Sequence, residues 1–265
     1  MTLVIYMQTF NFKKKFGQNF LNSKTIINKI VQSINPSSKD LIIEIGPGAG
    51  ALTKCLKQYN SQIIAYEVDT DTKKYLDSLE DDKCKIIYED FLETNILDEI
   101  KTYKYENLYI IGNLPYYITT KIISHIIDLK LNPKEMVFMV QKEVADRFMA
   151  KPGNKEYGYM TVILNYNYDL EKVVDVDKSN FTPAPKVDSS VVKLISKETN
   201  NDINYKSFDN FIKEAFRFKR KTIKNNLTNY NAEKLNNILT SYNLNTSSRP
   251  EDIPLDAYID LFLNK

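Results

Sequence analysis

The chain has 265 residues, of which 43% are hydrophobic and 26% charged, a composition typical of a folded globular protein rather than a disordered one. A formal net charge of +2 does not by itself indicate a nucleic-acid partner, so basic surfaces have to be sought in local clusters. Two cysteines without CxxC spacing predict no metal site, and a single histidine argues against a hydrolase with paired catalytic histidines.

The first ten residues, MTLVIYMQTF, lack the basic segment and the small-residue cleavage site of a secretion signal. The segment is also too short to span a bilayer. We therefore expect a cytoplasmic protein that has no membrane partner. We separately expect the protein to be monomeric.

Between residues 40 and 140, short apolar runs alternate with helical patterns. The apolar runs are LIIEIG (41–46), QIIAYEVD (62–69), KIIYED (85–90), NLYIIGNLP (107–115) and MVFMV (136–140). Alternation of this kind is typical of βα units, in which a parallel sheet is covered by helices on both faces. The pattern predicts an α/β fold with five strands in this region.

Two β-like stretches follow, after a helix near 141–148 and a helical run near 157–166. They are DLEKVVDV (169–176) and SSVVKLI (189–195), and they flank NFTPAPKVD (180–188), whose prolines prevent a regular helix. We expect an ordered loop there and an antiparallel pair that closes the sheet. The polar stretch 196–204 resembles a linker, so we predict domains at 1–196 and 197–265, the second purely helical.

A glycine-rich loop follows the first predicted strand. Gly46, Gly48 and Gly50 lie in EIGPGAG, which begins with Glu44. Glycines permit positive φ and let a ligand lie against the backbone at the carboxyl end of a strand. A tight βα turn that binds nothing explains the glycines equally well, so the loop alone decides little.

Two acids end the next two strands. Glu67 lies 21 residues after Gly46, where an acid can accept hydrogen bonds from both ribose hydroxyls of an adenosine cofactor. Asp90 can accept the adenine amino group, although capping of the following helix is an equally good interpretation. These positions indicate a nucleoside cofactor without separating NAD from S-adenosylmethionine.

The fourth strand runs into GNLPYY, which separates those two cofactors. The side-chain oxygen of Asn113 and the carbonyl of Leu114 can accept hydrogen bonds from both N–H groups of an exocyclic adenine amine, so that the nitrogen points its lone pair at a methyl group. Pro115 fixes the turn, and Tyr116 can stack on the base. Without its place after strand four, NLPY would be read as a simple β-turn.

A nucleotide-dependent dehydrogenase fits less well. The loop GPGAG does not have GxGxxG spacing, and no later residue supplies an acid or base for hydride transfer.

Several motifs in order resemble the ribosomal RNA adenine N6-dimethyltransferase family, and within it the small-subunit branch known for kasugamycin sensitivity. They are FGQNFL (16–21), EIGPGAGALT (44–53), GNLPYYITTKII (112–123), VQKEVADR (140–147), FTPAPKVDSSVV (181–192) and FRFKRKTIKNNL (216–227). Together they cover nearly the whole chain.

This resemblance implies a Rossmann-like class I methyltransferase: a mostly parallel seven-stranded sheet with an antiparallel closing strand, plus a small all-α C-terminal domain. It implies S-adenosylmethionine as cofactor and dimethylation of two adjacent adenosines near the 3′ end of small-subunit rRNA. Cofactor contacts are implied for Asn19, Leu21, Gly46, Gly48, Glu67, Asp90 and Asn113. Tyr116 and Phe181 are implied to hold the flipped base, while Asn113, Leu114 and Pro115 complete the catalytic motif.

The partner implied is the small ribosomal subunit and its rRNA, which must be held by shape and phosphates. Two basic clusters are candidates for this contact. The first consists of Lys13, Lys14 and Lys15, and the second of Arg217, Lys219, Arg220, Lys221 and Lys224. The alternative interpretation of both clusters is a merely solvated surface.

Two related functions remain as alternatives. Erythromycin-resistance methyltransferases act on large-subunit rRNA, but they typically show NIPY where this chain has NLPY, and they lack a segment like KRKTIKNNL. A non-catalytic ribosome assembly factor could keep the fold, although intact Asn113 and Glu67 argue against lost catalysis.

Overall fold

The structure is a computed structural model that describes residues 18–198 and 203–265, and its contacts divide the chain into two compact units. Unit 1 ends at Ala145 and resumes with Glu171–Ser196, whereas unit 2 comprises Asp146–Leu170 and Lys197–Lys265. The units differ from the domains predicted at 1–196 and 197–265 because residues 146–170 group with the C-terminal helices. The first crossing, after Ala145, falls inside the helix Lys142–Phe148.

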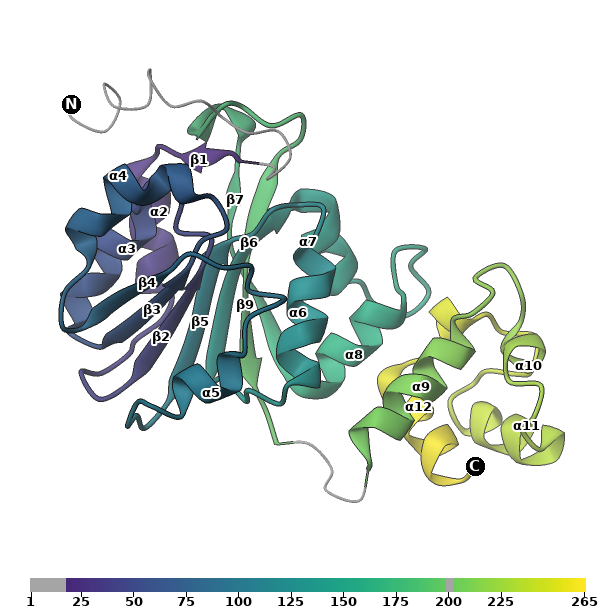
Figure 1. Ribbon diagram of the computed structural model, residues 1–265. Coiled ribbons are helices and arrows are strands. Elements are labelled where there is room, and N and C mark those ends of the chain that lie inside the picture. Colours follow the sequence, from purple (N-terminus) through teal and green to yellow (C-terminus); the bar gives the residue numbers. More distant parts are fainter. Residues whose placement is uncertain (1–17, 199–202) are drawn as a thin grey trace. The chain divides into compact units, whose positions relative to one another are not determined.

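A seven-stranded sheet organises unit 1 (Figure 1). Its strands are β2 (Leu41–Ile45), β3 (Gln62–Tyr66), β4 (Cys84–Ile87), β5 (Leu108–Asn113), β6 (Glu135–Gln141), β7 (Tyr168–Val176) and β9 (Ser189–Ser196), in the spatial order β4-β3-β2-β5-β6-β9-β7. Strands β2 to β6 pair in parallel, and β9 is antiparallel to β6. This confirms the predicted α/β fold, a mostly parallel sheet closed by an antiparallel strand.

Helices lie on both faces of this sheet, with α2, α3 and α4 on one side and α6 on the other (Figure 1). The helices of unit 1 are α2 (Lys24–Gln32), α3 (Ala51–Leu56), α4 (Lys73–Leu76), α5 (Ile96–Ile100) and α6 (Thr119–Asp128), followed by α7 (Lys142–Phe148) at its border with unit 2. Every residue of β2 is buried, as expected for a central parallel strand covered on both faces. Alternate strand residues such as Ile42 and Ile63 pack against Ile30 of α2 and Leu56 of α3 in one apolar cluster.

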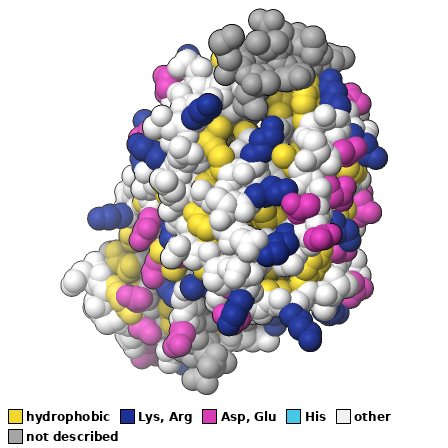
Figure 2. Space-filling model, turned by 90° about the vertical axis from the view of Figure 1, so that its left-hand side faces the viewer, with side chains coloured by type: hydrophobic (Ala, Val, Ile, Leu, Met, Phe, Trp, Pro, Cys, Tyr) yellow, Lys and Arg dark blue, Asp and Glu magenta, His cyan; other side chains and the backbone are white. Residues whose placement is uncertain are grey.

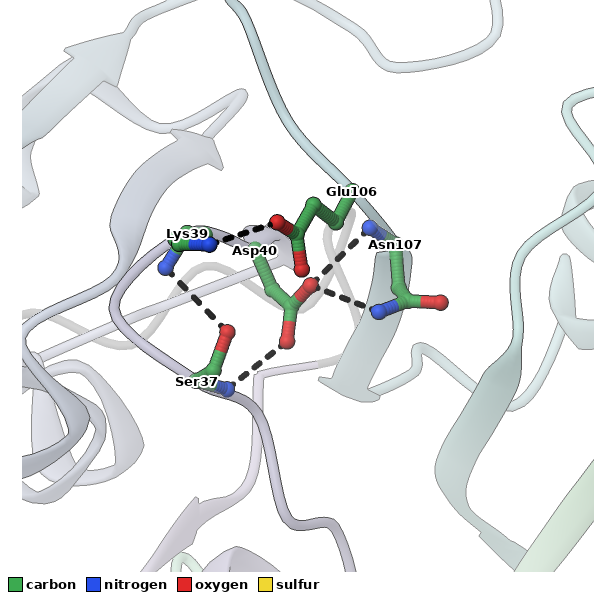
Figure 3. Close-up of polar contacts among 5 residues, drawn as sticks. All are labelled: Ser37, Lys39, Asp40, Glu106 and Asn107. Atoms are coloured by element: carbon green, nitrogen blue, oxygen red, sulfur yellow. Dashed lines mark hydrogen bonds and ion pairs between the residues drawn. The ribbon is translucent and has the colours of Figure 1, made fainter.

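A buried aspartate fastens the amino ends of β2 and β5 (Figure 3). The carboxylate of Asp40 accepts hydrogen bonds from the N–H of Ser37 at 2.7 Å and from the backbone and side-chain nitrogens of Asn107 at 2.9 and 2.8 Å. Burial opposes ionisation of Asp40, but these hydrogen bonds outweigh it and lower its pKa. Beside it, Lys39 and Glu106 form an exposed ion pair. This edge of the sheet is therefore fixed, and ligands bind at the opposite, carboxyl edge in such folds.

A second, two-stranded sheet joins segments far apart in the chain. Strand β1 (Phe20–Leu21) pairs antiparallel with β8 (Phe181–Thr182), with Leu21 opposite Phe181. The N–H of Asn22 continues the pairing to the carbonyl of Asn180 at 2.8 Å. The region of the predicted loop 180–188 thus begins with a short strand, and the Thr182–Pro183 bond within it is cis.

Among the described residues of unit 2, the regular elements are helices, apart from the first residues of β7. They are α8 (Tyr159–Asn167), α9 (Tyr205–Ala215), α10 (Ile223–Asn226), α11 (Ala232–Ser241) and α12 (Leu255–Leu263). The ring of Phe208 packs against two of these helices. Its centre lies 4.7 Å from the ring centre of Tyr166 in α8 and 5.4 Å from that of Phe262 in α12. Among the described residues, no helix of either unit has the length and apolar character needed to cross a bilayer.

Candidate active site

A cavity opens at the carboxyl ends of β2, β3, β4 and β5. Its lining comes from the glycine loop after β2, the acids after β3 and β4, the turn after β5, and the segment that leads into β1. Parallel strands bring their carboxyl ends to one edge, which is why motifs spread over a hundred residues meet here.

The glycine loop forms the floor of this cavity. Gly48 has a φ of 57°, and a β-carbon placed on it would lie 2.9 Å from the ring of Phe20. A side chain at this position would be strained by its φ and would press against the ring of Phe20. The N–H of Gly48 donates to Oε2 of Glu67 at 2.9 Å, so the loop is also held by the acid of the next strand.

Glu67 is buried and uses both of its carboxylate oxygens. Besides Gly48, the N–H of Asp69 donates to Oε1 at 2.8 Å. Burial raises the pKa of Glu67, although these donors act in the opposite direction. Asp69 in turn accepts a hydrogen bond from Gln18 at 2.6 Å, which ties the start of the described chain to the cavity.

A second buried acid, Glu44, lies at the end of β2. Only 1% of its surface is exposed, and neither carboxylate oxygen has a hydrogen-bond partner at normal geometry among the described residues. Burial, with a further contribution from the charge of Glu67, raises the pKa of Glu44 to about 7. The nearby hydroxyl and backbone of Thr53 in α3 oppose this rise, although the hydroxyl does not reach normal hydrogen-bond geometry. An unpaired buried carboxyl is costly, so this end of the cavity favours a positively charged ligand.

Asp90 lies in a turn after β4. Its Oδ1 accepts from the N–H of Leu92 at 2.9 Å, and the next helix, α5, is capped by Asn95 rather than by Asp90. The alternative interpretation of Asp90 as a helix cap therefore does not describe this structure. Apolar residues directly follow both acids, Val68 after Glu67 and Phe91 after Asp90, and both line the cavity.

Asn113 ends β5 at the centre of the cavity edge. Its side-chain nitrogen donates to the carbonyl of Asn19 at 2.9 Å. A carbonyl can only accept, so this bond fixes the orientation of the amide and turns Oδ1 into the remaining acceptor. Leu114 follows, almost fully buried, with its N–H bonded to the carbonyl of Met139 in β6 at 3.3 Å.

Tyr116 is anchored by its hydroxyl, which lies 2.6 Å from the hydroxyl of buried Ser189 at the start of β9. Burial raises the pKa of Tyr116, so the ring carries a neutral phenol. Phe181 does not line the cavity. It lies in β8 opposite Leu21, which does.

Most of the residues expected from sequence meet at this cavity. Its lining includes Asn19, Leu21, Gly46, Gly48, Glu67, Asp90, Asn113, Leu114, Pro115 and Tyr116. The basic residues expected to bind RNA are elsewhere: Arg217, Lys219, Arg220, Lys221 and Lys224 are exposed in unit 2, and Lys13, Lys14 and Lys15 lie outside the described residues. Sequence reasoning assigned no role to Glu44, Val68 or Phe91, although their positions beside the glycine loop and the two acids were a usable signal.

Comparison with known proteins points to one family. The family model described as ribosomal RNA adenine dimethylase matches residues 9–265. A ribosomal RNA small subunit methyltransferase A from Aster yellows witches'-broom phytoplasma (strain AYWB) is 42% identical over 219 residues, which span 82% of this chain and 81% of the relative.

Two solved structures share the fold. A dimethyladenosine transferase from Plasmodium falciparum superposes with a TM-score of 0.76 at 26% identity, over 92% of this chain and 96% of that one. The 23S rRNA methyltransferase ErmE superposes with a TM-score of 0.69 at 22% identity, over 92% and 98% of the two chains, a likeness that concerns the fold alone.

Proposed function

The chain belongs to the ribosomal RNA adenine dimethylase family, and from this premise we propose that it dimethylates N6 of two adjacent adenosines near the 3′ end of small-subunit rRNA. Membership makes it an enzyme, an rRNA adenine dimethyltransferase. The product of the proposed reaction is N6,N6-dimethyladenosine, formed during assembly of the small ribosomal subunit. The observation that carries the proposal is the gathering of Asn113, Glu67 and the glycine loop around one cavity.

S-adenosylmethionine fits the residues present. Two buried acids, Glu44 and Glu67, line the cavity, and their ionised forms favour a cofactor of net positive charge. Glu67 would hold the ribose, Asp90 the adenine amino group, and Glu44 would face the cationic part of the molecule. Val68 and Phe91 provide apolar surface for the adenine ring. When bound, the cofactor supplies an electrophilic methyl group.

The remaining chemistry is the work of the turn after β5. Oδ1 of Asn113 and the carbonyl of Leu114 would accept hydrogen bonds from the two N–H groups of the adenine amine, so that the nitrogen points its lone pair at the methyl group. The bond from Asn113 to Asn19 supports this assignment, because it holds the acceptor oxygen in one orientation before the substrate arrives. The methylated amine is acidic enough to lose its proton to water, so the site needs no general base.

The target base has to leave its stack to reach the cavity. Tyr116, held by Ser189, would stack on the extruded adenine, and Phe181 would contact it from β8. Since Phe181 is buried in its pairing with β1, its contact with the base requires β8 to present the ring on RNA binding. The residues of the second basic cluster would neutralise rRNA phosphates.

A methyl-transfer assay tests the proposal. Purified protein is incubated with labelled S-adenosylmethionine and undermethylated small ribosomal subunits, with large subunits in parallel, and the rRNA nucleosides are analysed. Dimethyladenosine at two neighbouring positions near the 3′ end is the expected result. Label confined to large subunits would reassign the chain to the resistance enzymes, and no label in either would leave only an assembly role. We further propose that the enzyme acts as a monomer in the cytoplasm.

A further inference from the structure

An exposed aromatic side chain lies within the second basic cluster. Phe218 is 50% exposed, and it is followed by Lys219, Arg220 and Lys221, all of them exposed. Covering an exposed aromatic side chain with another flat ring removes apolar surface from water, which is favourable. Here the side chains that flank the aromatic residue are positively charged. The surroundings therefore fit a polyanion that also offers flat, apolar rings.

Hydrogen bonds hold the loop that carries Phe218 in a defined conformation. The N–H of Phe218 donates to Oδ1 of buried Asn226 at 2.7 Å, and Nδ2 of Asn226 donates back to the carbonyl of Phe218 at 3.2 Å and to that of Thr222 at 3.1 Å. The N–H of Lys221 closes a turn onto the carbonyl of Phe218 at 2.9 Å. These bonds use only the backbone of Phe218, so they fix the position of the ring without burying it.

The cations around the ring are available for a partner. The guanidinium of Arg217 lies 5.1 Å from the centre of the Phe218 ring, a cation–π contact that leaves half of the side chain open. Among the described residues, none of Arg217, Lys219, Arg220 and Lys221 forms an ion pair with a carboxylate. Lys219 only donates to the carbonyl of Lys155.

We propose that Phe218 is a stacking platform for an unpaired base of the rRNA, with the neighbouring cations holding the phosphates on either side. The inference rests on the proposed function for the identity of the RNA. It adds a contact in unit 2 that would recognise RNA bases that are not paired. Base stacking on an aromatic ring is tolerant of sequence and independent of salt, whereas phosphate contacts weaken as salt rises. The two kinds of contact can therefore be separated by experiment.

The test uses the absence of tryptophan from the chain. In Phe218→Trp, tryptophan emission excited at long wavelength reports only on this position. Single-stranded oligoadenylate and undermethylated small subunits should quench it, and a duplex of equal length should not. Phe218→Ala and the apolar but non-aromatic Phe218→Leu should each weaken binding of the full-length chain to both single-stranded RNA and subunits about tenfold. Phe218→Trp should retain the affinity.

The salt dependence distinguishes stacking from charge. The slope of log affinity against log salt should be unchanged in Phe218→Ala and should fall by about 0.7 in Arg220→Ala for a single-stranded RNA. Leu263→Ala, which trims a 48% exposed side chain on α12, is the control and should bind normally. Unchanged affinity in both the Ala and Leu variants, or constant tryptophan emission at saturating RNA, overturns the inference. Methyl transfer by the wild-type chain is scored separately, so the proposed function stands or fails on its own result.

Discussion

The side-chain nitrogen of Asn113 donates a hydrogen bond to the carbonyl of Asn19, 2.9 Å away and 94 residues earlier in the chain. The bond joins the end of β5 to the segment that enters β1, and both line the cavity. It also decides which end of the amide can accept a hydrogen bond from a substrate. The proposed catalytic acceptor is therefore oriented by the protein before any ligand binds.

Replacing Asn113 by alanine should separate catalysis from cofactor binding. We expect Asn113→Ala to lower kcat about 100-fold or more, because the reacting amine loses an oriented acceptor, while the Kd for S-adenosylmethionine changes much less. Single-turnover methyl transfer and calorimetric titration give the two quantities. An equal loss in both would contradict the assigned role. Asn113→Asp, which keeps oxygen acceptors but loses the donor to Asn19, should also be impaired if orientation matters.

Glu44 should make the stability of the ligand-free enzyme depend on pH. Burial raises its pKa from 4.5 to about 7, so between these values the folded chain holds a proton that the unfolded chain has lost. Stability should therefore fall as pH rises from about 4.5 to 7, by roughly 3 kcal/mol, and stay at the lower level above it. Urea titrations at pH 5 and 8 should show this difference in the wild type and a smaller one in Glu44→Gln.

The same carboxyl should couple cofactor affinity to pH. A cationic ligand binds the ionised form better, so the affinity for S-adenosylmethionine should rise up to about tenfold between pH 6 and 8 in the wild type. Glu44→Gln, nearly identical in shape, should bind more weakly and lose most of this rise. If the pH dependence were the same in both proteins, Glu44 would not face the charged part of the cofactor.

Asp40 should contribute to folding far from the cavity. Asp40→Ala leaves the donors of Ser37 and Asn107 unpaired, and we expect it to lower the free energy of unfolding by about 1–3 kcal/mol at pH 7. The pKa of Asp40 is lowered in the folded state, so its contribution is present above its ordinary value of 3.8 and is lost as pH falls below it. Wild type and variant should converge in acid. Lys39→Ala, which removes only an exposed ion pair, is the matched control and should unfold like the wild type.

Charge reversal at Arg220 and Lys221 should weaken binding to small subunits and reduce its salt dependence, because phosphate contacts release counterions. The control is Lys206→Glu with Lys234→Glu, which makes the same change in net charge on α9 and α11 of the same unit. On the face drawn in Figure 2, basic and acidic side chains are interspersed, so net charge alone offers little attraction there. A salt slope equal to that of the wild type in the Arg220 and Lys221 variant would assign RNA binding to another surface.

The central fold was predictable from sequence because it depends on long, regular signals. Strands such as β2 and β5 consist mainly of buried apolar residues, which is what a sheet covered on both faces demands. Their carboxyl ends carry the glycine loop and Asn113, so the cavity followed from topology. The antiparallel β9 was also recognisable as an apolar stretch. In the structure seven of its residues pair with β6.

Other parts of the site depend on contacts that leave no local pattern. The two-residue strands β1 and β8 are too short for periodicity, and without the family resemblance Asn19 and Leu21 would have been read as the entry to a helix. The missing partner of Glu44 is likewise a property of its surroundings, because nothing in the sequence says whether a buried carboxyl finds a donor. The grouping of residues 146–170 with the C-terminal helices depends on packing such as that of Tyr166 on Phe208.

The pairing of β1 with β8 would couple the binding of the two proposed ligands, the cofactor and the RNA. Leu21 belongs to the cavity wall, and its backbone partner Phe181 is the residue proposed to meet the substrate base. A movement of either strand has to be followed by the other, or their shared hydrogen bonds break. By linkage, whatever factor the bound cofactor contributes to RNA affinity, RNA must return to cofactor affinity in equal measure.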